Sequence, residues 1–252
     1  MGKIIAVANQ KGGVGKTTTC VNLCAALTEM RLKVLLCDMD PQSNATSGLG
    51  LDKNKKAANI YNVLIEGVDA AEAIVKTPYG DALPSNKILS GAGVELVMMD
   101  SREFVLKNVL ATVRDSYDYI IIDCPPSLEM LTLNSLCAAD TVLIPVQCEY
   151  FALEGLADLT STIRMIKKSL NQALEIEGVL LTMHDSRTNF SSQVAAEIKK
   201  FFKHKVYTVA IPRSVRLAEA PSHGEPATAY DRASRGSLAY IELAKEFVKR
   251  NS

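Results

Sequence analysis

Residues 11–18 read KGGVGKTT, and they follow directly on an apolar run. The three glycines, Gly12, Gly13 and Gly15, allow a tight turn whose backbone N–H groups can point at phosphate oxygens. A helical pattern begins at Lys16, so the positive end of a helix is expected beside the same turn. A glycine-rich turn that binds nothing is the alternative, but the strand-to-helix position favours a phosphate loop.

The polar side chains of this loop each have an expected role around a bound nucleoside triphosphate. Lys16 is expected to reach the β- and γ-phosphates, the Thr17 hydroxyl to bind Mg²⁺, and Thr18 to donate to a nearer phosphate. The sequence thus indicates ATP and Mg²⁺ as ligands. The candidate nucleotide-binding residues are Lys11, Gly12, Gly13, Val14, Gly15, Lys16, Thr17 and Thr18.

One position departs from the common phosphate-loop pattern. That pattern places a glycine five residues before Gly15, and this chain has Gln10 there. Lys11 then adds a second lysine at the mouth of the loop. Such a lysine is either solvated or projects its charge across a dimer interface towards a partner's nucleotide, and spacing alone leaves both alternatives open.

Working outward from the loop, short apolar runs alternate with helical patterns along the whole chain. The runs are continuously apolar, which is typical of parallel strands covered on both faces. We therefore predict an α/β fold: a doubly wound, mostly parallel sheet with helices on both faces, in one domain spanning residues 1–252. The least readable segment is residues 51–90. The expected strands are 4–8, 34–37, 119–122, 142–146, 179–183 and 206–211, and the expected helices are 16–30, 101–113, 153–170, 191–202 and 234–249.

Three aspartates follow predicted strands at the edge where such sheets bind ligands. Asp123 ends the run at 119–122, where its carboxylate could hold Mg²⁺ through a water. Asp38 and Asp40 follow the run at 34–37. We predict that Asp40 positions the attacking water and that Asp38 supports the metal. Strand-end aspartates that merely cap loops are the alternative, and the phosphate loop nearby favours the functional interpretation.

Composition narrows the class of protein further. Lys and Arg together number 28, as do Asp and Glu, so any nucleic-acid binding must come from a local patch. The six cysteines form no C-x-x-C pair, which favours small buried side chains in a reducing compartment over zinc or disulfides. No apolar run is long enough to span a bilayer, and the first residues lack the order of a signal peptide. We expect a cytoplasmic protein.

Six ordered motifs extend the phosphate loop into a resemblance that covers nearly the whole chain. The motifs are KGGVGKTTT, LLCDMDPQSNATSGLG, YDYIIIDCPPS, VLIPVQCEYFALEGL, GVLLTMHDSRTN and IPRSVRLAEAPSHGEP. Together they resemble the ParA/Soj chromosome- and plasmid-partitioning ATPases, a deviant Walker A family. The match is nearest to the Soj branch, which consists of the ATPase domain without an added DNA-binding domain at its N-terminus.

The resemblance implies roles at matching positions. Lys11 matches the signature lysine that crosses an ATP-sandwiched homodimer, and Asp40 matches the aspartate required for hydrolysis. Together with Lys16 these are the expected catalytic residues. Thr17 and Asp123 match the Mg²⁺ ligands, and Pro212 lies where the family lines its adenine pocket. Proteins of this kind bind double-stranded DNA without sequence preference, associate with the nucleoid, and are released by a ParB-type partner that stimulates slow hydrolysis.

A basic segment near the C-terminus is the candidate DNA surface. Between residues 187 and 216 the chain carries seven Lys and Arg residues against the lone acid Glu197, the type of cluster that phosphate contacts need. A solvated helix face explains the lysines equally well. Phe201 and Phe202 continue a helical stripe and are predicted to be core. The candidate DNA-binding residues are Arg187, Lys199, Lys200, Lys203 and Arg216, the two arginines matching positions that the Soj branch uses on DNA.

Two rival functions share the nucleotide motifs. A MinD-like membrane-associated positioning ATPase would need an amphipathic C-terminal tail, and this chain ends in FVKRNS, which favours a packing helix with a short polar end. A nitrogenase-type iron protein would need a second cysteine in a glycine-rich loop to accompany Cys124, and none is found. An ATP-dependent amide synthase is the other metabolic alternative.

Overall fold

The computed structural model describes the whole chain except residues 56, 150–151, 186–188 and 252, and it leaves the side chains of 189 and 190 undescribed. Its centre is a seven-stranded sheet in the order β3-β4-β2-β5-β1-β6-β7, parallel throughout except for the antiparallel pair of β3 and β4. The strands are β1 (Lys3–Val7), β2 (Val34–Asp38), β3 (Val75–Thr77), β4 (Gly80–Leu83), β5 (Tyr119–Asp123), β6 (Thr141–Gln147) and β7 (Glu175–Thr182).

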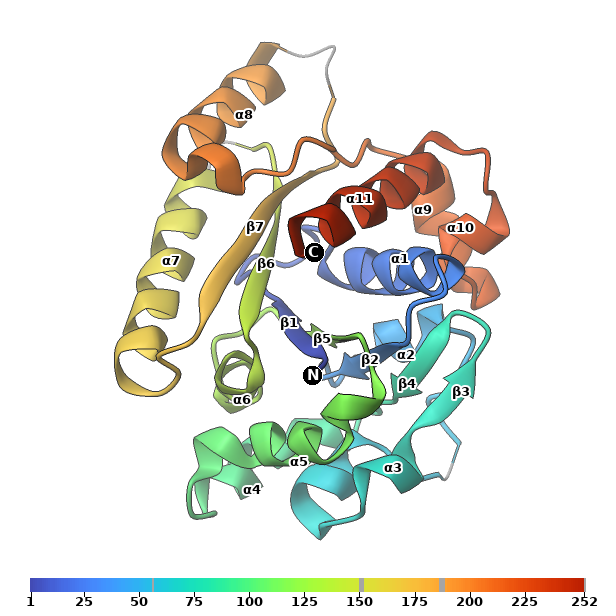
Figure 1. The fold of residues 1–252 in the computed structure, drawn as a ribbon, viewed down its shortest axis with the longest axis vertical. Helices are drawn as coiled ribbons and strands as arrows, with labels where there is room; N and C mark the ends of the chain where they lie inside the picture. The colour runs from blue at the N-terminus through green and yellow to red at the C-terminus, as the bar shows by residue number, and fades with distance from the viewer. Residues whose placement is uncertain (56, 150–151, 186–188, 252) are drawn as a thin grey trace.

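Helices cover both faces of this sheet, as Figure 1 shows. Helix α1 and the C-terminal helices lie on one face, and α5 to α8 lie on the other. The longer helices are α1 (Lys16–Glu29), α4 (Leu89–Val97), α5 (Val105–Val113), α6 (Met130–Ala138), α7 (Ala152–Ser169), α8 (Asn189–Phe202) and α11 (Arg235–Asn251). The shorter ones are α2 (Asn44–Gly48), α3 (Ala70–Ala73), α9 (Val215–Glu219), α10 (Ala227–Tyr230), the π-helix η1 (Asn62–Glu66), and the 3₁₀ segments η2 (Arg102–Phe104), η3 (Arg114–Ser116), η4 (Lys203–Lys205) and η5 (Ala220–His223). The predicted fold class is confirmed.

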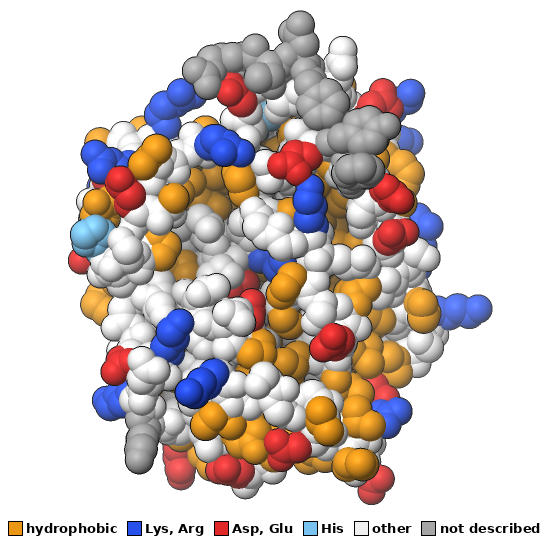
Figure 2. All heavy atoms as spheres, turned by 180° about the vertical axis from the view of Figure 1, so that it is seen from behind, with side chains coloured by type: hydrophobic (Ala, Val, Ile, Leu, Met, Phe, Trp, Pro, Cys, Tyr) orange, Lys and Arg blue, Asp and Glu red, His pale blue; other side chains and the backbone are white. Residues whose placement is uncertain are grey.

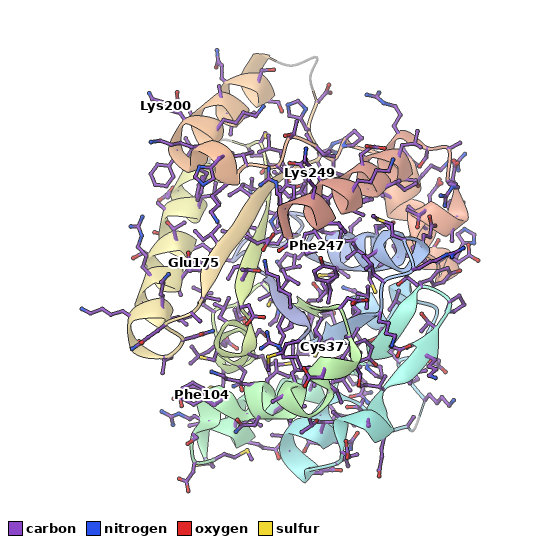
Figure 3. All side chains as sticks on the ribbon, in the orientation of Figure 1. Cys37, Phe104, Glu175, Lys200, Phe247 and Lys249 are labelled. Atoms are coloured by element: carbon purple, nitrogen blue, oxygen red, sulfur yellow. The ribbon has the colours of Figure 1, made fainter. Side chains whose placement is uncertain are left out.

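Two hydrophobic cores follow from the alternation of side chains along the strands. In β1, Ile5 and Val7 join the core beneath α1 and α11, whereas Ile4 joins the core beneath α5 to α8. Phe247 of α11 is fully buried and packs edge-on against Tyr119 of β5, with ring centroids 5.1 Å apart (Figure 3). All six cysteines are free and buried, as their positions predicted.

The strand predicted at residues 206–211 is wrong. Val206 makes an isolated bridge to Val179, but no regular strand follows. The Glu246 carboxylate of α11 instead accepts from the backbone N–H of Thr208, at 2.9 Å, and of Val209, at 3.0 Å. The segment still runs along β7, because the Tyr207 N–H donates to the Val179 carbonyl at 2.9 Å and the Ile211 N–H to the Leu181 carbonyl at 2.8 Å. Between them Glu246 takes the two N–H groups, which interrupts a regular ladder.

The segment that was least readable contains the two strands that the sequence did not predict. Strand β4 adds to the sheet edge beside β2, and β3 turns back on it through Gly80, whose φ of +115° favours glycine. Within the described residues, no helix combines the length and apolarity needed to cross a membrane.

Candidate active site

The phosphate loop connects β1 to α1 and has the backbone shape that its glycines predicted. Gly13 and Gly15 have φ of +73° and +90°, in the region that favours glycine. A Cβ atom placed on Gly12 or Gly13 would meet no heavy atom within 4 Å. The loop therefore borders open space, which is where a bound phosphate group would lie.

Two side chains beside the glycine turn hold it in this shape: Asn9, just before Lys11, and Thr182, on β7. The Asn9 amide donates to the Pro145 carbonyl at 2.7 Å, and its oxygen accepts from the Lys11 N–H at 3.0 Å. On the other side, the Thr182 hydroxyl donates to the Val14 carbonyl at 2.7 Å. The loop is thus supported by β6 and β7 before any ligand binds. Our sequence analysis missed the role of Thr182 and that of Asn9, because only the sheet brings Thr182, and the Pro145 carbonyl that Asn9 binds, to the loop.

Lys16 is the buried cation of the site. Its side chain crosses the loop and its Nζ donates to the Lys11 carbonyl at 3.1 Å, and the residue is only 7% exposed. Burial lowers the pKa of Lys16, while the nearby carboxylates of Asp123 and Asp40 act in the opposite direction. Lys16 therefore makes no ion pair with any residue that the structure describes, although acidic groups lie near it, and its charge is available to a phosphate group.

Asp38 and Asp123 lie side by side because β2 and β5 pair in register there. Both carboxylates are fully buried. Burial raises the pKa of Asp123, and the neighbouring Asp38 raises it further; burial is also the main cause of the raised pKa of Asp38. Asp123 Oδ2 has no hydrogen-bond partner within the described residues. A buried oxygen of this kind is unstable unless a cation or a proton binds to it.

The carboxylate of Asp38 is occupied by its own chain. Its Oδ2 accepts from the Thr46 N–H at 2.8 Å and from the Thr46 hydroxyl at 2.7 Å, and its Oδ1 accepts from the Asp40 N–H at 3.1 Å. Ser85 extends the network from the end of β4 by donating to the Asp40 carbonyl at 2.9 Å. These bonds favour a structural role for Asp38, as the anchor of residues 40–46.

Asp40 lies at the edge of the same site. It is 7% exposed, and one of its oxygens accepts from the Gln42 N–H at 2.9 Å. That is the one hydrogen bond to its carboxylate among the residues that the structure describes. The second oxygen is therefore free to accept from a water molecule.

Lys11 forms an ion pair that the sequence did not predict. Its Nζ contacts the carboxylate of Glu149, in the segment that follows β6, and both side chains remain about two-fifths exposed, at 42% and 43%. The lysine is therefore neither simply solvated nor directed into its own phosphate loop. Pro212 forms an isolated parallel β-bridge with His184. His184 is two residues beyond Thr182, which binds the phosphate loop, so Pro212 lies close to that loop.

The candidate DNA-binding residues do not form one patch in this chain. Lys199, Lys200 and Lys203 are exposed on α8 and η4 and make no ion pair within the described residues; Figure 3 labels Lys200 on the outer side of α8. Arg216 lies on α9, on the other side of α11 in Figure 1. It pairs with Glu219 at 2.8 Å and Asp231 at 3.2 Å.

Two further sequence expectations concern this region. Arg187 lies outside the described residues. Phe202 is buried as predicted, but the prediction for Phe201 is wrong, because that side chain is 61% exposed. On α8, Phe202 lies on the buried face of the helix, whereas Phe201 lies on the exposed face with Lys200. Acidic and basic side chains are otherwise interspersed over the face in Figure 2, in keeping with zero net charge.

The residues present fit a magnesium nucleotide. The loop offers open, glycine-lined space at the N-terminus of α1, Lys16 lies buried beside it, and Asp123 keeps a buried oxygen without a partner. Mg²⁺ in nucleotide sites is commonly held by one or two protein oxygens together with phosphate oxygens, and this donor set suits that chemistry.

A parallel sheet, a phosphate loop and strand-end carboxylates define the class of P-loop ATPases. Residues 2–176 match the family model AAA_31, an AAA domain. The chain is 56% identical to the sporulation initiation inhibitor protein Soj of Bacillus subtilis over 98% of both chains, and 50% identical to the chromosome partitioning protein ParA of Myxococcus xanthus over 100% of this chain and 90% of that one. The chain belongs to the ParA/Soj family of partitioning ATPases, and it uses ATP and Mg²⁺.

A solved structure adds support for the ligands. Cobyrinic acid a,c-diamide synthase of Mycobacterium smegmatis, with ADP and magnesium bound, superposes with a TM-score of 0.87 at 39% identity, over 99% of this chain and 95% of that one. Its name corresponds to the amide synthase alternative. The higher identity to Soj and ParA, over nearly full length, favours the partitioning class.

Proposed function

We propose that this protein is a nucleotide-timed switch for chromosome or plasmid partitioning. It dimerises when it binds ATP, binds double-stranded DNA without sequence preference in the cytoplasm over the nucleoid, and is released when a ParB-type partner stimulates slow hydrolysis. The observation that carries this proposal is a preformed phosphate loop beside the buried, unpartnered Asp123 Oδ2, in the described part of a chain 56% identical to Soj.

The loop residues bind the phosphates. The N–H groups of residues 12–18 donate to phosphate oxygens, and Lys16 exchanges its contact with the Lys11 carbonyl for the β- and γ-phosphates. Thr17 and Asp123 would hold Mg²⁺, with Asp38 fixing the loop behind them, and Pro212 would border the adenine. When bound, Mg²⁺ neutralises the charge that develops on the transferred phosphoryl group.

Asp40 orients the attacking water. Its Oδ1 is held by the Gln42 N–H, which leaves the second oxygen to accept from a water directed at the terminal phosphate. Ser85 and Asp38 hold the backbone on either side of its carboxylate. A rigid support of this kind sets the direction of the accepted hydrogen bond.

Lys11 links nucleotide binding to dimerisation. In the single chain Glu149 pairs with it, and this exposed pair is weak enough to exchange. In the dimer, Lys11 leaves Glu149 and crosses to the phosphates of the other subunit, and Glu149 is then free to pair elsewhere. The dimer therefore forms only when phosphates are present to receive the two lysines.

The dimer joins two weak basic surfaces into one strong one. Lys199, Lys200 and Lys203 supply phosphate contacts without sequence preference, together with Arg187 and Arg216. Because two linked surfaces act at a high effective concentration, a dimer binds DNA far more tightly than a single chain. Hydrolysis dissolves the dimer and so releases the DNA.

DNA retention by the purified protein tests this function directly. We would measure it with ATP, with ADP and without nucleotide, each at several salt concentrations. Retention that requires ATP and falls steeply with salt is the expected result. Retention in no state would leave the ATPase assignment intact and contradict the partitioning switch, and binding to anionic liposomes would then favour the MinD-like alternative.

A further inference from the structure

A buried thiol contacts the carboxylate of Asp123. Cys20 lies on α1, one helical turn after Thr17, and its Sγ donates to Asp123 Oδ1 at 3.4 Å. Both residues are fully buried. The contact joins the helix that follows the phosphate loop to the end of β5.

This contact helps to fix the orientation of the Asp123 carboxylate. Oδ1 is engaged by the thiol, whereas Oδ2 is buried without a partner. The two oxygens of an ionised carboxylate are equivalent, so the thiol fixes the plane of the group, and rotation out of that plane would break the bond to sulfur. Water has no access to replace it, since neither residue is exposed. The orientation of the free oxygen therefore depends on the thiol together with the Thr17 side chain, which also hydrogen-bonds this carboxylate.

We propose that Cys20 is a positioning residue for Asp123, and through it for Mg²⁺. The inference rests on the proposed role of Asp123 as a Mg²⁺ ligand. Hydrogen bonds to a ligating carboxylate orient it, and their loss commonly costs about 10- to 100-fold in metal affinity. Thr17 and Cys20 lie three residues apart on one face of α1. One helix turn therefore carries a proposed Mg²⁺ ligand, Thr17, and the thiol that orients the other proposed ligand, Asp123.

The chain contains a matched control for this proposal. Cys24 lies one turn further along α1, is equally buried, and donates through Sγ to the Tyr79 carbonyl at 3.3 Å. Its contact points to the connection between β3 and β4, away from Asp123. Truncating either thiol to alanine removes a similar volume from the core beneath α1, so the packing cost is comparable.

Manganese binding tests the proposal without relying on hydrolysis. Mn²⁺ would be titrated by electron paramagnetic resonance, with a non-hydrolysable ATP analogue at saturation. We expect Cys20→Ala to raise the Mn²⁺ Kd by about 10-fold. Cys24→Ala should leave it within about twofold of the wild type, and Cys20→Ser, which keeps a donor, should recover most of the affinity.

Several results would overturn the positioning role of Cys20. Equal losses for Cys20→Ala and Cys24→Ala would reduce the effect to packing and overturn the positioning role. An unchanged Kd in Cys20→Ala would do the same. If Cys20→Ala fails to fold, the Mn²⁺ affinity of Cys20→Ser is compared with that of Asp123→Asn. A folded Cys20→Ser protein that binds Mn²⁺ as weakly as Asp123→Asn would overturn the positioning role. Wild-type affinity in Asp123→Asn would instead remove the metal role of Asp123 itself, while DNA retention would still report on the switch.

Discussion

The protonation state of Asp123 is expected to change the stability of the ligand-free protein with pH. Burial, and then Asp38, raise its pKa from 3.8 to about 8. A carboxyl with a raised pKa binds its proton more tightly in the folded state, so its contribution to stability is complete below the unfolded pKa and is lost as the pH rises through the folded one. The ligand-free protein should therefore become less stable between these two values.

Asp123→Asn tests this residue-scale prediction. The variant has no carboxylate to ionise, so we expect its ligand-free Tm to exceed that of the wild type at pH values above the raised pKa, by about 2–4 °C for each kcal/mol recovered. It should also lose the further stabilisation that Mg²⁺ and ATP give the wild type. Thermal unfolding across pH measures both effects, and a lower Tm for the ligand-free variant at high pH would contradict the prediction.

Asp40 is expected to act in catalysis and not in binding. Its free oxygen lies at the site edge, and none of its hydrogen bonds supports the phosphate loop itself. Asp40→Ala should therefore keep ATP and DNA binding while hydrolysis falls by about 10²- to 10⁴-fold. Phosphate release and nucleotide binding would be measured on the same sample. Loss of nucleotide binding would refute the assignment.

At the scale of elements, α8 and η4 carry the exposed lysines of the proposed DNA surface. Replacing Lys199, Lys200 and Lys203 by alanine should weaken ATP-dependent DNA binding and lower the slope of log K against log salt by about 2 to 3, since each lost phosphate contact removes about 0.9. The matched control is Lys76→Ala/Lys107→Ala/Lys168→Ala, which removes the same charge from exposed positions elsewhere. Equal slopes for the two triple variants would place the DNA surface elsewhere.

Sequence patterns predicted most long elements correctly, and their failures have physical causes at this scale. The helices at α1, α7 and α11 carry periodic apolar stripes over several turns, so their existence is a local property. The short strands β3 and β4 have three and four residues, too few for a pattern to be read. The expected strand at 206–211 is interrupted where Glu246, from the last helix, accepts from the N–H groups of Thr208 and Val209, although N–H groups on either side still donate to β7.

For the whole molecule, the proposed dimerisation requires Lys11 to leave its ion pair with Glu149. An exposed pair contributes about 0.2–1 kcal/mol, so releasing Lys11 costs little. Because each dimer releases two such pairs, Glu149→Gln should lower the protein concentration at which half of it is dimeric with ATP by about 2- to 30-fold. Lys11→Ala should abolish the ATP-dependent dimer. Light scattering during gel filtration measures both, and a weaker dimer in Glu149→Gln would show that Glu149 supports the interface instead.

The sequence by itself determined the phosphate loop and the positions of the strand-end aspartates. Both are local properties, because consecutive glycines set the backbone of a turn and an apolar run sets where a strand ends. Only the tertiary structure decided the partner of each functional side chain: Glu149 for Lys11, 138 residues away, and Cys20 for Asp123, 103 residues away. Such contacts arise where the parallel sheet brings the ends of distant strands together, and no spacing along the chain records them.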